Sequence, residues 1–478
     1  MSRPSPTLST KLFYGFGSVA FGVKDQGFSF LLLLYYNQVL GLPEKWVGLG
    51  IMITLFVDAF ADIAIGHFSD NLHTRWGRRH PLMYFSAIPV AVSYYLLWSP
   101  PAGLSHESLF AYFVSIAIVI RIFISLYEVP SSSLVPELTT HYDERTSLLG
   151  FRFFFGWWGG LAMAVLAFQL FLQPDAAHPV GVLNPDGYRA YGIAASIIMA
   201  CAILISALGT HSYIPHLRKP PAKKPFDLHR TFSELRATLA NRAFLALFGS
   251  MIFASMAAGL MAALSIYFNT FFWELTSGEM SLLVGTSFIA AALALAIAPR
   301  LSKRLGKKRA AVSIALAAIV LGPSPIVLRL LGLFPDNHAP ALMPALLAVN
   351  LLVITLLIGS SIVSSSMIAD VVEDSELSTG RRSEGTFFAA SSFVQKCVSG
   401  IGIFSSTLLL GVIGFPQNAK PGEVPAEVVR DLGLVYTPMI VALLLVSIGF
   451  LALYPISRAK HEDNLRRLAR AAEAGAGG

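Results

Sequence analysis

The sequence predicts an all-α membrane protein whose twelve transmembrane helices form two pseudo-symmetric halves of six helices each. Composition is the first reason, because hydrophobic residues make up 55% of the 478 residues and charged residues only 13%. Soluble domains average about 25% charged residues, so a soluble enzyme is excluded. The two cysteines, Cys201 and Cys397, are too few for a disulfide-stapled secreted domain. The 34 Phe and 15 Tyr residues exclude intrinsic disorder.

The spacing of the apolar stretches is the second reason. A helix needs about 20 apolar residues to cross a bilayer, and no stretch alternates as a barrel strand would. The first stretch is not followed by a small-residue cleavage site, so we expect a retained helix and not a signal peptide. The predicted spans are 12–38, 46–68, 81–100, 107–134, 149–172, 189–213, 244–272, 280–300, 310–334, 341–369, 386–414 and 433–456.

Lysine and arginine gather in alternate loops, which sets the predicted orientation. With both termini cytoplasmic, the inner side receives Arg75, Arg78, Arg79, Arg218, Lys219, Lys223, Lys224, Lys303, Arg304, Lys307, Lys308, Arg309 and the tail from Arg458 to Arg470. The outer side keeps Lys45, Arg189, Arg329, Lys420 and Arg430. We therefore expect a multi-pass protein of a bacterial inner (plasma) membrane. The net charge of +7 then reflects contact with anionic membrane lipids and not with nucleic acid.

An internal repeat is the third reason. The longest polar segment, a central cytoplasmic loop at 214–243, separates a six-helix bundle at 1–213 from a second at 244–457, and 458–478 forms a cytoplasmic tail. Basic residues surround Gly77 after the second span and Gly306 after the eighth in the same order. Two six-helix halves with matched loops are typical of transporters built from repeats.

The glycine-basic loops also predict a gate on the cytoplasmic side, where basic side chains meet acidic partners and helix C-termini. In the simpler interpretation the loops only carry positive-inside charge. The predicted gate residues are Arg75, Arg78, Arg79, Asp143 and Arg381, with Asp70, Asp143 and Glu144 as acidic partners.

Ionisable residues inside spans cost about 2.5–3.5 kcal/mol each on insertion scales, so each one calls for an explanation. The N-terminal half holds Lys24, Asp25, Asp58, Asp62, Arg121 and Glu128, whereas Lys396 is the exception in the C-terminal half. This asymmetry predicts an ion or proton site in the N-terminal half.

Asp58 and Asp62 are four residues apart and therefore lie on one helix face. Two carboxylates this close in a low dielectric require either a bound proton or a bridging cation, and both states suit ion-coupled transport. Ser125 can add a hydroxyl oxygen for sodium. In the alternative, the two acids form ion pairs with basic residues of other spans, namely Lys24, Arg121 or Arg152.

Several residues allow two interpretations. Arg121 contacts substrate or forms an internal ion pair with Glu128 or Asp25, while the Asp25 carboxylate suits the hydroxyls of a polyol. Aromatic and amide side chains near the ends of spans are expected to anchor at the membrane interface, namely Tyr35, Tyr36, Asn37 and Trp273. Trp157 and Trp158 are expected to pack between helices, with stacking on a sugar as the alternative.

Five segments carry a resemblance to a known family: GFGSVAFGVKDQGF, VDAFADIAIGHFSDNLHTRWGRRHP, YEVPSSSLVPEL, ADVVEDSELSTGRRSEG and FVQKCVSGIG. They resemble the glycoside–pentoside–hexuronide:cation symporters, the melibiose permease-like branch of the major facilitator superfamily. The resemblance covers nearly the whole chain and implies the major facilitator fold.

The resemblance also implies site residues. The family's cation-site acids correspond to Asp58 and Asp62, and its hydroxyl ligand to Ser125. Its substrate-binding positions correspond to Asp25 and Glu128, with a basic residue beside the sugar pocket at Arg152 and a lysine near the cation site at Lys396.

Three positions depart from the family pattern. Ala61 replaces an asparagine between the two acids and removes a sodium ligand, so sodium and proton coupling are equally open. Ile63 replaces a proline. Ser132 replaces the aromatic residue that stacks on the sugar, so a galactoside is not predicted, and an amphipathic lysolipid stays open.

The sequence therefore predicts a secondary active, cation-coupled symporter of a sugar or glycoside-like solute that works by alternating access. The alternatives are a cation-coupled carrier of a lysolipid or other amphiphile, and, in another class, a solute sensor or channel. No phosphate-binding loop, zinc spacing or nucleophile elbow indicates an enzyme, and no cofactor is expected besides the coupling sodium or proton. One chain holds both repeats, so a monomer is expected to function.

Overall fold

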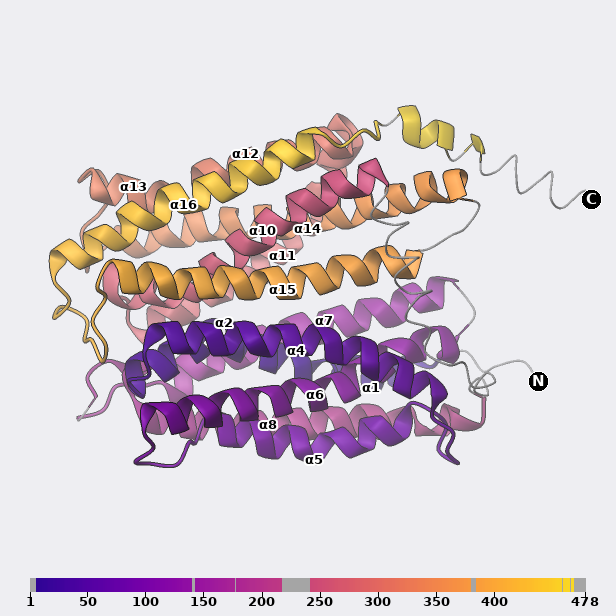
Figure 1. The fold of residues 1–478 in the computed structure, drawn as a ribbon, viewed down its shortest axis with the longest axis horizontal. Helices are drawn as coiled ribbons and strands as arrows, with labels where there is room; N and C mark the ends of the chain where they lie inside the picture. The colour runs from indigo at the N-terminus through magenta and orange to yellow at the C-terminus, as the bar shows by residue number, and fades with distance from the viewer. Residues whose placement is uncertain are drawn as a thin grey trace, which may run out of the picture. The chain divides into compact units, whose positions relative to one another are not determined.

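The structure is a computed structural model. It describes residues 6–139, 142–176, 178–216, 241–379, 384–457, 459–464 and 466–467. Within these ranges the regular secondary structure is helical, with no β-strand (Figure 1). The described helices confirm the predicted all-α class.

The helices follow the predicted spans in order. They are α1 (Leu8–Phe16), α2 (Val19–Phe30), α3 (Leu32–Leu34), η1 (Tyr35–Val39), α4 (Glu44–Asn71), α5 (His80–Leu97), α6 (His106–Leu138), α7 (Tyr142–Leu166), η2 (Ala167–Phe171), η3 (Gly181–Leu183), α8 (Pro185–Gly209), η4 (His211–His216), α10 (Arg242–Tyr267), η5 (Phe268–Phe272), α11 (Ser277–Leu305), α12 (Lys307–Leu321), α13 (Ser324–Leu330), α14 (Leu342–Thr379), α15 (Glu384–Val412) and α16 (Ala426–Ala452).

Ten of the described helices are long and apolar enough to cross a membrane. The two other predicted spans also fall on helices. The span at 12–38 is divided among α1, α2, α3 and η1, and the span at 81–100 corresponds to α5, an 18-residue helix with Pro89 inside it. Proline removes a backbone donor, and it is tolerated inside a membrane helix where neighbouring groups compensate.

The chain divides into two compact units. Unit 1 comprises Met1–Phe226, Ala262–Gly285 and Ile403–Val429, and unit 2 comprises Asp227–Met261, Thr286–Gly402 and Arg430–Gly478. Unit 1 therefore contains the N-terminal half together with two short pieces of the C-terminal half. The predicted central loop lies almost entirely outside the described residues, as does most of the tail.

In unit 1, α2 packs against α7 through glycines. A Cβ atom at Gly22 would lie 1.9 Å from the Gly156 carbonyl oxygen, and one at Gly160 would lie 2.5 Å from the Gly22 carbonyl oxygen. Small residues let membrane helices approach closely, so these glycines set the distance between the two helices.

In unit 2, α10 and α15 approach each other in the same way. A Cβ atom at Gly259 would lie 2.2 Å from the Ser399 carbonyl oxygen, and one at Gly402 would lie 2.1 Å from the Met256 carbonyl oxygen. The first and fifth spans of each half thus make an equivalent glycine crossing, because α2 and α7 belong to the first half and α10 and α15 to the second.

Two further features repeat between the halves. Gly77 and Gly306, the glycines of the matched basic loops, adopt φ angles of +76° and +81°. These angles lie in the left-handed region, which glycine enters without a steric cost. The first span of each half also ends in a π-helical turn, η1 in one half and η5 in the other. The internal repeat predicted from the loops therefore extends to backbone conformation.

Candidate functional site

The two acids of the predicted cation site lie one turn apart on α4. Asp58 is buried with 1% of its surface exposed, and Asp62 is partly exposed. The Ser125 hydroxyl on α6 lies 2.6 Å from Asp62 Oδ1 and 3.3 Å from Asp58 Oδ1. The structure thus brings Asp58, Asp62 and Ser125 together, with one hydroxyl within hydrogen-bond distance of both carboxylates.

Arg121 lies one turn before Ser125 on α6 and joins the same cluster. Its Nη1 atom lies 3.2 Å from Asp58 Oδ2, and its Nε atom donates to Thr54 Oγ1 at 3.1 Å. The guanidinium carbon lies 4.9 Å from the centroid of the Phe28 ring. Arg121 therefore forms its ion pair with Asp58, and not with the Glu128 or Asp25 partners considered for it from the sequence.

A second cluster surrounds Arg152 on α7. Its Nη1 atom donates to Ser131 Oγ at 3.1 Å, and its Nη2 atom lies 3.8 Å from Glu128 Oε1. The guanidinium carbon lies 4.9 Å from the Phe21 ring centroid. Arg152 and Glu128, both predicted substrate residues, therefore lie together beside an aromatic side chain.

Asp25 is the most exposed acid of the predicted site. Lys24 Nζ lies 2.6 Å from Asp25 Oδ1, and the exposed fractions of the two side chains are 6% and 60%. The carboxylate therefore keeps accessible oxygen lone pairs while its charge is balanced. A solute hydroxyl can donate to such a group.

The sequence also singled out Lys396, Trp157 and Trp158. Lys396 is half-buried on α15 in unit 2, whereas the other predicted site residues with described side chains belong to unit 1. Trp157 and Trp158 on α7 are 44% and 40% exposed, and Trp158 stacks with Phe154 at a ring distance of 5.1 Å. Packing between helices was expected for the two tryptophans, and these exposed fractions show that such packing covers each residue only in part.

The basic loop after α4 forms a compact ion-pair cluster in unit 1. Arg78 Nη2 and Arg79 Nε lie 2.7 and 3.2 Å from Glu137 Oε1, and Arg79 Nη2 lies 2.6 Å from Asp70 Oδ1. Arg79 also donates to Ser69 Oγ at 2.7 Å. These contacts join the C-terminal end of α4, the start of α5 and the end of α6.

Sequence reasoning named Asp70 as a partner in this cluster but missed Glu137. An acid in the last turn of α6 is unfavourable for the helix dipole, so it indicates a nearby cation. Glu144, the other candidate partner, instead lies 2.7 Å from Lys11 Nζ. Arg75 is exposed and lies over the Trp76 ring at 5.7 Å. The side chain of Asp143 and the whole of Arg381 fall outside the described residues.

The matched loop of unit 2 makes comparable contacts. Lys307 pairs with Asp370 on α14, and Lys308 Nζ donates to the Tyr454 carbonyl oxygen at 2.9 Å. Burial, aided by the nearby carboxylate of Asp370, raises the pKa of the Tyr454 phenol. The phenol therefore stays protonated and donates to the Met367 carbonyl oxygen at 3.2 Å.

The opposite end of unit 1 carries a polar seal made by Asn37, Gln38, Tyr267 and Ala419. Tyr267 Oη donates to Asn37 Oδ1 at 2.5 Å, and Gln38 Nε2 donates to the same oxygen at 2.7 Å. The Ala419 amide donates to Gln38 Oε1 at 2.8 Å. The seal fastens the end of the first span to segments that follow it by more than two hundred residues.

The seal corrects the prediction of interfacial anchors. Tyr36 is fully buried, Tyr35 is 3% exposed and Asn37 is 2% exposed, so none of them faces the membrane interface. Trp273, also predicted as an anchor, is 4% exposed and lies 4.7 Å from the Phe272 ring. The residues of Ala262–Gly285 and Ile403–Val429 that join unit 1 account for this burial.

Comparisons with known proteins agree with this architecture. A family model described as "MFS/sugar transport protein" matches residues 13–458. The chain is 24% identical to the isoprimeverose transporter of Lactiplantibacillus pentosus, over 90% of this chain and 86% of that protein. It is 24% identical to the sodium-dependent lysophosphatidylcholine symporter 1 of Gallus gallus, over 98% and 90% of the two chains.

Solved structures share the fold at low sequence identity. A D-xylose-proton symporter superposes with a TM-score of 0.64 at 14% identity, over 93% of this chain and 97% of that one. Together with the family model, this agreement covers almost the whole length of the described chain.

Proposed function

Because the chain belongs to the MFS/sugar transport protein family, and is therefore a membrane transporter and not an enzyme, we propose that it carries a sugar-like solute together with a proton. The observation that carries the proposal is the cluster of Asp58, Asp62, Ser125 and Arg121. The Ser125 hydroxyl lies within reach of both carboxylates while Arg121 pairs with one of them.

The Arg121–Asp58 pair favours a proton over sodium. Sodium is a hard cation that prefers several oxygen ligands, but both Asp58 oxygens already lie near Arg121 or Ser125. Side chains four residues apart on a helix lie about 5–6 Å from each other, and two like charges at that distance repel by about 3 kcal/mol at an effective dielectric constant of about 20. Ala61 offers no side-chain ligand. A proton on Asp62 changes the charge of the site without needing a coordination shell.

The solute is expected to bind beside this cluster. The accessible Asp25 carboxylate can accept sugar hydroxyls, and the Arg152 guanidinium can donate to ring or hydroxyl oxygens near Glu128. Because Asp25 is paired with Lys24 and Arg152 with Glu128, a neutral solute can bind these side chains without leaving either of them as an uncompensated ion.

Coupling follows if protonation of Asp62 and solute binding favour the same conformation. Each ligand then raises the affinity for the other by the same factor, typically about 5–150-fold. The polar seal at one end of unit 1 and the ion-pair cluster at the other are proposed to open alternately as the solute crosses.

The test uses the full-length chain in liposomes with an imposed pH gradient or an imposed sodium gradient. We expect the pH gradient to drive uptake of a pentoside, and Asp62→Asn to abolish that uptake. Asp186→Asn, an exposed acid at the start of α8, is the matched control and should transport normally.

Asp62 is a sharper target than Asp58. Asparagine at position 58 leaves the buried Arg121 guanidinium without its carboxylate, and removing one partner of a buried pair costs about 3–5 kcal/mol. Loss of uptake in Asp58→Asn therefore counts only if the purified variant elutes as a folded monodisperse species. Wild-type uptake by Asp62→Asn would refute the assignment of Asp62 as the proton-binding residue. Uptake driven by sodium at constant pH would show that the coupling ion is sodium and not a proton.

A lysolipid is the second candidate solute, supported by the likeness to the lysophosphatidylcholine symporter over 98% of this chain. The same liposomes can be assayed with lysophosphatidylcholine in place of the pentoside. Transport of the lysolipid with no transport across a panel of pentosides, hexosides and uronides would replace the sugar assignment.

A further inference from the structure

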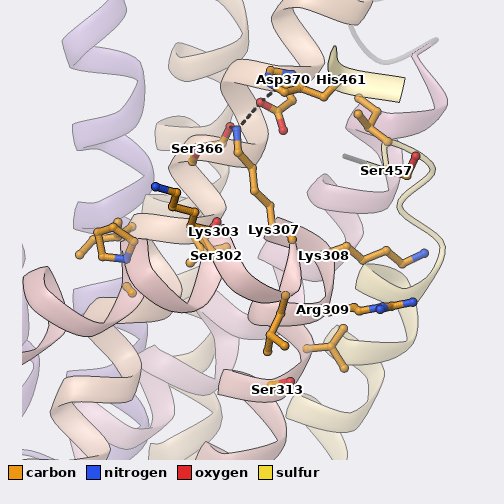
Figure 2. Close-up of a pocket in the computed structure, with 18 of the residues that line it drawn as sticks. Ser302, Lys303, Lys307, Lys308, Arg309, Ser313, Ser366, Asp370, Ser457 and His461 are labelled. Atoms are coloured by element: carbon orange, nitrogen blue, oxygen red, sulfur yellow. Dashed lines mark hydrogen bonds and ion pairs between the residues drawn. The ribbon is translucent and has the colours of Figure 1, made fainter. Parts of the chain in front are cut away.

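A cavity of about 1270 Å³ lies in unit 2 where α11 ends, α12 begins and the chain leaves α16 (Figure 2). Four basic side chains line it, Lys303, Lys307, Lys308 and Arg309, against two acids, Asp370 and Glu462. The rest of the wall is mainly apolar or hydroxylic. Basic side chains beside an apolar wall are complementary to an amphiphile with an anionic head.

The basic residues of the cavity differ in whether an acidic partner balances their charge. Lys307 pairs with Asp370, whereas Lys308 donates to a neutral carbonyl oxygen, that of Tyr454. Arg309 is exposed and forms no ion pair with any residue in the described part of the chain. In Figure 2 the Lys308 and Arg309 side chains extend in the same direction, toward the segment that follows α16. Two positive charges are thus presented side by side.

The backbone adds to the positive potential. Lys307, Lys308 and Arg309 form the first turn of α12, whose N-cap is Gly306 and whose first turn contains no acidic residue. A helix N-terminus carries a partial positive charge and favours anions there. Acidic residues usually occupy the first turn of a helix, whereas this turn has three consecutive basic residues. A bound anion would compensate the repulsion between these positive charges and the helix dipole.

Exposed apolar side chains also lie elsewhere on the helices that form the cavity. Leu295 on α11, Leu316 and Val320 on α12 and Leu445 on α16 are 47–69% exposed, as expected for helix surfaces that face lipid tails. Val312, Ile362 and Ile456 continue the apolar surface inside the cavity. The positive-inside rule places this end of the helices at the inner leaflet.

We propose that this cavity binds the phosphate head group of an anionic phospholipid of the inner leaflet. Lys308 and Arg309 contact the phosphate, and the apolar wall receives the start of an acyl chain. The occupant also contacts Ser457 and His461 and so ties the segment after α16 to the start of α12.

The test titrates phosphatidylglycerol into the detergent-purified full chain and follows its thermal unfolding. Phosphatidylcholine tests for general lipid effects, and glycerol 3-phosphate tests for a soluble anion. A basic residue near an anionic lipid contributes roughly a fivefold change in affinity. We therefore expect Arg309→Glu, a change of two charges, to weaken the apparent affinity for phosphatidylglycerol about 25-fold.

Arg304→Glu is the matched control, because Arg304 is exposed on the last turn of α11 and does not line the cavity. It should bind phosphatidylglycerol within about twofold of wild type, and Arg309→Lys should bind nearly normally. Equal losses in Arg309→Glu and Arg304→Glu would overturn the site. So would wild-type binding by Arg309→Glu. Full stabilisation by glycerol 3-phosphate alone would overturn the lipid as the occupant.

Discussion

Arg121 gives the proposed coupling site a permanent positive charge. Its guanidinium pairs with Asp58 and donates to Thr54, so a fixed cation already compensates the charge of one of the two carboxylates. The fixed positive charge of Arg121 would then determine which ion is transported. The choice between sodium and a proton becomes a property of one position on α6.

This argument predicts that ion selectivity can be switched. The double variant Ala61→Asn/Arg121→Gln removes the fixed charge and adds two amide oxygens near Asp58 and Asp62. We expect sodium to stabilise it against heat and to drive its uptake, whereas the pH gradient drives less. Arg121→Lys retains the charge and should stay insensitive to sodium. A double variant with no sodium response in either measurement would show that Arg121 does not select the ion.

Helical spacing predicted part of the site at the residue scale. Asp58 and Asp62 share one face of α4, as Arg121 and Ser125 share one face of α6, and both follow from a separation of four residues. Which basic residue pairs with which acid depends on how each helix is rotated against its neighbours, and a single sequence carries no such information. For that reason Arg121, Arg152 and Lys24 were interchangeable until the structure assigned them to Asp58, Glu128 and Asp25.

At the scale of the elements, glycines control how closely the first and fifth spans of each half approach. The α2–α7 crossing leaves no space for a methyl group at Gly22, since the obstruction is the backbone of α7 itself. A flexible side chain can move aside, but a helix backbone moves only if the two helices separate.

Gly22→Ala is therefore expected to destabilise the protein by about 1–3 kcal/mol, the usual cost of overpacking. Gly150→Ala on α7 is the matched control, because no heavy atom lies within 4 Å of its added Cβ. Alanine favours helices over glycine by about 0.5–1 kcal/mol, so this control should be unchanged or slightly more stable. The check is the thermal unfolding midpoint of each purified variant. Equal midpoints for Gly22→Ala and Gly150→Ala would contradict the close approach of α2 and α7.

The sequence located most elements because apolar length and breaks are local properties. The environment predicted for the C-terminal end of the first span was wrong because it depends on residues far away in the sequence. Tyr35, Tyr36 and Asn37 resemble interfacial residues by composition, yet chain segments near Tyr267 and Ala419 cover them. Hydropathy cannot distinguish a helix end that faces lipid head groups from one covered by distant parts of the chain.

For the whole molecule, the distribution of lysine and arginine predicts that both termini face the cytoplasm. The prediction can be checked with single cysteines in a variant that lacks Cys201 and Cys397. A membrane-impermeant maleimide should label Glu423→Cys in intact cells and Arg304→Cys only after the cells are opened. Both introduced positions are exposed, so access to the reagent differs only by the side of the membrane. Labelling of Arg304→Cys in intact cells would invert the orientation.

The polar seal of Asn37, Gln38, Tyr267 and Ala419 predicts that the apparent affinity for solute differs between the two sides of the membrane. Each hydrogen bond contributes about 0.5–1.5 kcal/mol net. Three bonds join the first span to later segments: Tyr267 donates to Asn37, Gln38 donates to the Pro416 carbonyl oxygen, and the Ala419 amide donates to Gln38. Together they favour the sealed conformation by about 1.5–4.5 kcal/mol. Without solute, the conformation open at that end is then a minor population of several per cent or less. Solute arriving there meets an affinity reduced by that fraction, whereas solute from the other side does not. The carrier would thus have a directional bias in apparent affinity, set by amide and phenol groups that lie outside the proposed binding site.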